Sequence, residues 1–88
     1  MKWKNLKGTG DNQASKPWLD IWKERAAYKG NPPCGRKGCN KAATLGAHVI
    51  KVDSDDRSWY LLPLCDSCNK LDDAFEKKAE IPVAPAAK

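Results

Sequence analysis

Four cysteines arranged in two pairs are the residues of this 88-residue chain best suited to chemistry. Cys34 and Cys39 enclose four residues, and Cys65 and Cys68 enclose two. Short loops of this kind let neighbouring thiolates converge on one tetrahedral Zn²⁺ ion without strain, and two glycines in the first loop give it backbone freedom. The spacing predicts a four-cysteine zinc site. Because protein fills every coordination position, such an ion is structural rather than catalytic.

A redox pair, two disulfides and an iron site are the alternative uses of these cysteines. A thioredoxin-like Cys-x-x-Cys belongs in a βαβ unit, which a chain of this length is too short to build. The sequence lacks a secretory signal and an apolar run of the ~20 residues that cross a bilayer. We therefore expect a soluble cytoplasmic protein without a membrane partner, in which thiols stay reduced. Iron also binds four thiolates, so the sequence does not distinguish an iron site from a zinc site.

The composition indicates one small basic domain. A core in so short a chain is usually marginal without a metal, disulfides or a partner. Four tryptophans concentrate the apolar area in a few large side chains. The formal net charge of +5 is compatible with an anionic partner such as nucleic acid.

Four elements are expected to position the cysteines. Tryptophans and other apolar residues at helical spacing predict an amphipathic helix over 15–29. Prolines and glycines make 34–39 a turn, the zinc knuckle. β-Branched and aromatic residues on both sides of a polar turn predict a β-hairpin over 44–63. Polar capping residues after Cys65 predict a final helix over 66–78.

The two ends of the chain lack such periodicity. Residues 1–14 mix lysine, glycine and polar residues, and we expect a flexible basic arm there. Residues 81–88 contain two prolines, and we expect an irregular tail. The predicted fold is thus a small α+β zinc domain over 15–80, with an N-terminal amphipathic helix, a zinc knuckle, a β-hairpin and a C-terminal helix.

The order of knuckle, hairpin and helix resembles a treble-clef zinc finger. Within it, "GAHVIK" followed by "WYLLPLCDSCNK" resembles the HNH, or His-Me finger, endonucleases of the four-cysteine type, whose ββα unit holds a catalytic metal beside the structural zinc. The resemblance covers about residues 34–78. It implies that His48 is a general base, a task that suits an imidazole because its pKa lies near neutral pH. It also implies that Asn69 binds a second, catalytic metal ion. In the predicted helix Asp73 lies one turn later on the same face, where it could add an oxygen ligand for Mg²⁺ or a similar hard ion.

Two positions depart from the family's catalytic motif, which is degenerate here. Tyr60 stands where the family has an asparagine that orients the histidine, and Ala47 where it often has a metal-binding aspartate. The remaining residues also have structural interpretations. His48 can be a packing residue, Asn69 can hydrogen-bond a knuckle carbonyl, and Asp73 can be a solvated helix charge.

Three functions fit these observations. The first is a zinc-stabilised module that binds nucleic acid, expected to be DNA, without cutting it. The second is an active metal-dependent endonuclease that uses His48 as general base. The third is a treble-clef adaptor that binds another protein within a larger assembly. The candidate phosphate contacts are basic residues of the arm and of the knuckle or beside it: Lys2, Lys4, Lys7, Arg36, Lys37 and Lys41.

Overall fold

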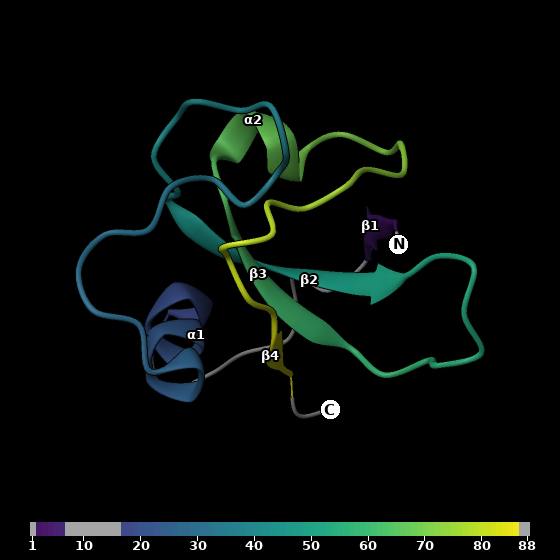
Figure 1. Cartoon of the computed structure of the whole chain (residues 1–88), viewed down its shortest axis with the longest axis horizontal. Coiled ribbons are helices and arrows are strands. Elements are labelled where there is room, and N and C mark those ends of the chain that lie inside the picture. Colours follow the sequence, from purple (N-terminus) through teal and green to yellow (C-terminus); the bar gives the residue numbers. More distant parts are fainter. Residues whose placement is uncertain (1, 7–16, 87–88) are drawn as a thin grey trace.

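A four-stranded antiparallel sheet in the order β1-β2-β3-β4 forms the centre of the computed structural model, which describes residues 2–6 and 17–86 (Figure 1). The elements are β1 (Trp3–Asn5), α1 (Trp18–Ala26), β2 (Leu45–Lys51), β3 (Tyr60–Leu64), α2 (Asp66–Asn69) and β4 (Ala84–Pro85). Within those residues no helix has the length and apolar character that spanning a bilayer requires. The α+β class predicted from the sequence is confirmed.

The predicted hairpin is present as β2 and β3, which pair antiparallel from Leu45 opposite Leu64 to Val49 opposite Tyr60. Directly opposite residues of such a pair lie on the same face of the sheet, and successive residues alternate between faces. His48 therefore shares one face with its partner Leu61, whereas Val49 and Tyr60 lie on the other. Both faces are covered by other parts of the chain.

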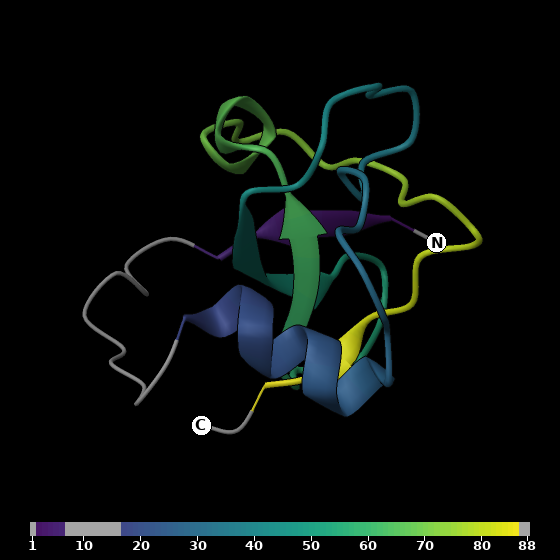
Figure 2. The same cartoon turned by 90° about the vertical axis from the view of Figure 1, so that its left-hand side faces the viewer.

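Helix α1 covers the face that carries His48, as Figure 2 shows. A Cβ atom at Gly46 would lie 2.6 Å from the backbone of Trp18, so only glycine lets α1 approach β2 this closely. Trp22 is fully buried, and its Nε1 donates a 3.0 Å hydrogen bond to the carbonyl of Pro82. The helix ends at Ala26 because Ala27 adopts the left-handed conformation, three residues before the predicted end.

The knuckle and the segment after α2 cover the opposite face. Gly35 donates a 2.6 Å hydrogen bond to the carbonyl of Pro63. A Cβ atom on Gly35 would lie 2.9 Å from the side chain of Leu62, so the knuckle fits tightly against β3. Phe75 is buried and exchanges two backbone hydrogen bonds with Trp3, of 2.7 and 2.8 Å.

Both ends of the described chain join the sheet, so the predicted arm and tail are wrong there. Trp3 is only 5% exposed and packs its ring edge-on against Tyr60, with centroids 5.5 Å apart. Burial of so large an apolar side chain offsets the entropy lost when the arm becomes ordered. At the other end, Ala84 and Pro85 pair with β3. Residues 7–14 of the predicted arm lie outside the described residues.

The predicted C-terminal helix over 66–78 is also wrong, because α2 ends at Asn69. Beyond it the chain is extended and pairs with the knuckle. Lys37 donates a backbone hydrogen bond to Glu76, and Lys78 donates one to Gly35, both of 2.8 Å. These long-range bonds and the buried Phe75 compete successfully with the local helix propensity of the segment.

Candidate metal centre

The four cysteines converge at one end of the sheet, where the knuckle lies beside α2 (Figure 1). Their Sγ atoms all lie within 4.8 Å of one another, and those of Cys39 and Cys65 are 3.8 Å apart. Zn–S bonds of about 2.3 Å at tetrahedral angles place sulfur atoms about 3.8 Å apart, whereas a disulfide needs about 2.05 Å. All four cysteines are free thiols. The cluster has the dimensions of a metal site.

Local turns of the backbone orient the two thiols of each pair towards a common position. In the knuckle, Cys34 donates a backbone hydrogen bond to Lys41 and Cys39 donates one to Arg36. Gly38 closes this turn with a φ of 91°, a conformation that side chains disfavour. In the second pair, Cys65 immediately precedes α2, and its carbonyl accepts a hydrogen bond from Asn69. Cys65 and Cys68 therefore lie on one helical turn.

The thiols differ in how readily they ionise. Burial raises the pKa of Cys34 and of Cys68. Burial also opposes ionisation of Cys65, but hydrogen bonds from the Cys68 amide and the neighbouring thiols outweigh it and lower the pKa of Cys65 to about 7. A divalent cation at the centre would let all four deprotonate, because it favours the thiolate form of each ligand. The donor set and its spacing fit zinc.

Arg36 lies next to the cysteine cluster and is held in place from two sides. Its Nη2 donates a 2.8 Å hydrogen bond to Asp73, and its guanidinium lies 5.2 Å from the ring centre of Phe75. Its Nη1 is buried without a hydrogen-bond partner in the part of the chain that the structure describes. The Asp73 hydrogen bond raises the pKa of Arg36, and the charges of Cys68 and Cys34 contribute. A fixed cation here would offset the negative charge of four thiolates around Zn²⁺.

Replacing this cation is expected to weaken metal binding. We expect Arg36→Ala to lower the zinc affinity by about 10-fold or less, because its guanidinium favours the thiolate forms of Cys68 and Cys34 through its charge. Lys37→Ala is the matched control, because Lys37 lies in the same turn but makes an exposed 3.4 Å ion pair with Glu76. Competition with a chromophoric chelator measures both affinities. Equal affinities in the two variants would contradict this role of Arg36.

The family resemblance implies that His48 lies near α2, but the structure places His48 away from this helix. Asn5 lies opposite Val49 and therefore on the same face of the sheet. Its side chain donates hydrogen bonds to the carbonyls of Cys68 and Leu71, so the face that carries Val49 is the one that contacts α2. His48 points to the opposite face, where its ring lies 4.6 Å from that of Trp18 and 5.8 Å from that of Trp59.

The surroundings of His48 are those of a packed residue. Its side chain is 6% exposed, and Nε2 has no hydrogen-bond partner among residues 2–6 and 17–86. Burial lowers the pKa of His48, which keeps the imidazole neutral. The histidine thus has a proton-accepting nitrogen, but the described residues enclose its side chain almost completely.

The predicted second metal site is not assembled in the described residues. Asp73 does not lie one helical turn beyond Asn69, because α2 ends at Asn69. Its carboxylate instead forms the ion pair with Arg36, which lowers the pKa of Asp73. Among the described His, Cys, Asp and Glu side chains, the four cysteines are the one group of three or more close enough to share an ion.

The predicted phosphate contacts divide into paired and unpaired cations. Arg36 and Lys37 are engaged with Asp73 and Glu76, and Lys41 lies 3.5 Å from the hydroxyl of Ser67. Lys2 and Lys4 are exposed, and Lys7 lies outside the described residues. Sequence reasoning missed Arg57, an exposed residue that lines a pocket with Trp59. The cation and the aromatic residue of "RSW", separated by one serine, were the available signal.

Together these features define a small α+β domain with an antiparallel four-stranded sheet and a four-cysteine cluster suited to a metal ion such as zinc. Comparisons with protein families, with curated proteins and with solved structures gave no match. The resemblance to HNH endonucleases rests on the sequence motif alone.

Proposed function

We propose that this chain is a zinc-stabilised domain, related in arrangement to treble-clef fingers, that binds DNA through its phosphates without cleaving it. The supporting observation is a pair of exposed cations, Lys4 and Arg57, that make no ion pair within the described residues. Lys4 lies opposite Ile50 on the edge strand β1, and Ile50 lines the same pocket as Arg57. The two charges therefore flank one surface.

This surface replaces the knuckle as the main candidate for phosphate contacts. Arg36 and Lys37 of the knuckle are already paired with Asp73 and Glu76, and a phosphate would have to displace those carboxylates. Lys4 and Arg57 can pair with phosphates at no such cost, because neither forms an ion pair with an acid in the part of the chain that the structure describes. Lys2, which is exposed and precedes β1, extends the same edge.

Binding without cleavage is favoured by the position of His48. A general base must reach the attacking water, directly or through one intervening water molecule. His48 is instead enclosed between Trp18 and Trp59 on the sheet face turned away from α2. We expect supercoiled plasmid to stay intact with Mg²⁺, Mn²⁺ or Ni²⁺. Nicking that His48→Ala abolishes would instead support the endonuclease.

Salt dependence tests the proposed function. We expect the affinity for a short DNA duplex to fall as salt rises, with a slope near −0.9 for each phosphate neutralised. Lys4→Ala is expected to weaken binding and reduce the slope by about one. Lys29→Ala is the matched control, because Lys29 is exposed just beyond α1, on another part of the molecule. Absence of a slope, or equal effects of the two variants, would favour the protein adaptor.

A further inference from the structure

A pocket of about 410 Å³ lies beside the loop that joins β2 to β3. Leu6, Ile50 and Trp59 form its apolar wall, and Lys51, Ser54, Asp56 and Arg57 form its polar wall. Pockets of roughly 300–1,000 Å³ with an apolar lining and a few polar groups are typical of sites for small ligands. The volume is sufficient for a single nucleotide.

The polar wall is held in place by Asp56. Its carboxylate accepts hydrogen bonds from the amide of Ser58 and the hydroxyl of Tyr60, and forms a 3.0 Å ion pair with Lys51. The Tyr60 hydrogen bond is the main reason that the pKa of Asp56 is lowered. Asp56 and Lys51 therefore neutralise each other and fix the shape of the loop.

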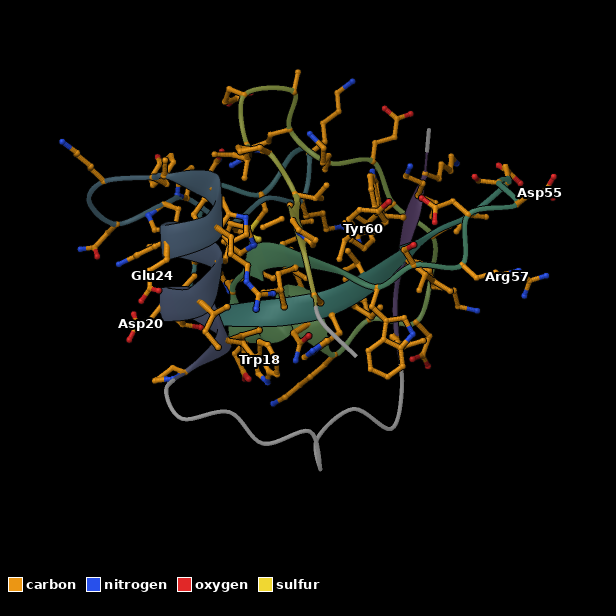
Figure 3. The ribbon with its side chains drawn as sticks, turned by 90° about the horizontal axis from the view of Figure 1, so that it is seen from below. Trp18, Asp20, Glu24, Asp55, Arg57 and Tyr60 are labelled. Carbon is orange, nitrogen blue, oxygen red and sulfur yellow. The ribbon has the colours of Figure 1, made fainter. Side chains whose placement is uncertain are left out.

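Arg57 is the uncompensated charge of this pocket. Figure 3 shows Arg57 extending outward at the end of the loop, away from α1. It makes no ion pair within the described residues, and Lys4 on the neighbouring strand faces the same side as Ile50. The exposed loop acids Asp53 and Asp55 are not among the residues that line the pocket. A ligand with an anionic end is complementary to this rim.

We propose that the pocket holds one unpaired nucleotide of single-stranded DNA, with its base against Trp59 and its phosphates beside Arg57 and Lys4. This inference rests on the proposed function and specifies its substrate. Stacking on an aromatic side chain accepts any base, and a positively charged rim follows the backbone of a single strand. A base in a duplex is enclosed between its neighbours, so it cannot enter the pocket without first leaving the stack.

Binding to a ten-nucleotide oligothymidylate and to a duplex of equal length, measured by fluorescence anisotropy, tests the proposal. We expect tighter binding of the single strand. Trp59→Ala is expected to weaken single-strand binding about 5- to 100-fold and leave the salt slope unchanged, and Trp59→Phe should retain most of the affinity. Arg57→Ala is expected to reduce the single-strand slope by about 0.7. Lys29→Ala is again the control.

The outcomes separate this site from the function on which it rests. If the wild-type protein binds DNA and Arg57→Ala weakens binding, but Trp59→Ala behaves like Lys29→Ala, the pocket does not hold a base and the proposed phosphate contact stands. If the wild-type protein binds neither oligonucleotide at low salt, both are wrong. Thermal melting monitors the fold of each variant. Should Trp59→Ala unfold, the wild-type protein still decides the question, because a duplex bound as tightly as the single strand would contradict a pocket for an unpaired base.

Discussion

Chelation of the bound metal is expected to unfold most of this domain. Structural zinc contributes about 10–16 kcal/mol of binding free energy to small zinc-finger peptides, which equals or exceeds the ~5–15 kcal/mol of net stability in a typical domain. One face of the sheet is covered by the knuckle and the extended segment after α2, which contain little regular structure of their own. Without the metal, this cover is held by separate backbone hydrogen bonds and the burial of Phe75, with no crosslink between the knuckle and α2. Near-ultraviolet circular dichroism of the tryptophans measures the loss.

Substitution of a ligand should have the same effect as chelation. We expect Cys68→Ser to abolish the cooperative thermal transition even with zinc in excess, because it leaves the ion three-coordinate by protein. Ser67→Ala is the matched control, since Ser67 is exposed in the same turn between Cys65 and Cys68. An apoprotein or a Cys68→Ser variant that melts cooperatively at the temperature of the holoprotein would contradict a structural metal.

Removal of the Trp3 side chain is expected to cost the domain about 3–5 kcal/mol, as do other losses of a large buried aromatic group. Trp3 is 5% exposed and packs against Tyr60, and its backbone is hydrogen-bonded to that of Phe75. At about 4 °C or more for each kcal/mol in a domain of this size, Trp3→Ala should lower Tm by at least about 12 °C.

The neighbouring residue provides the comparison for this substitution. Lys4 lies in the same strand but is exposed, so Lys4→Ala should change stability by less than about 0.5 kcal/mol. Denaturant unfolding of both variants in zinc-saturated buffer separates the two effects. If Trp3→Ala were as stable as Lys4→Ala, the N-terminal residues would be the unstructured arm that the sequence suggests, and β1 would not contribute to the sheet.

The features that sequence reasoning predicted correctly depend on short-range patterns. Two closely spaced cysteine pairs predict that the four thiols lie close together, because the geometry of each pair follows from the length of its loop. The hairpin of β2 and β3 follows from two β-prone runs on either side of a polar turn. The amphipathic helix around Trp18 and Trp22 follows from spacing along one helical face. Each of these signals lies within one segment.

The features that were missed depend on contacts between distant segments. Trp3 and Phe75 pair although most of the chain separates them in sequence, and no local pattern predicts that either residue pairs in this way. The same pairing ends α2 at Asn69 and places Asp73 beside Arg36 instead of beside a second ion. The face on which His48 lies follows from the strand register.

X-ray absorption at the zinc edge of the purified protein tests the central claim most directly. We predict one zinc ion per chain with four sulfur neighbours at about 2.3 Å, the thiolates of Cys34, Cys39, Cys65 and Cys68. A protein that folds without bound metal, or a zinc ion with nitrogen or oxygen neighbours in place of sulfur, would contradict it.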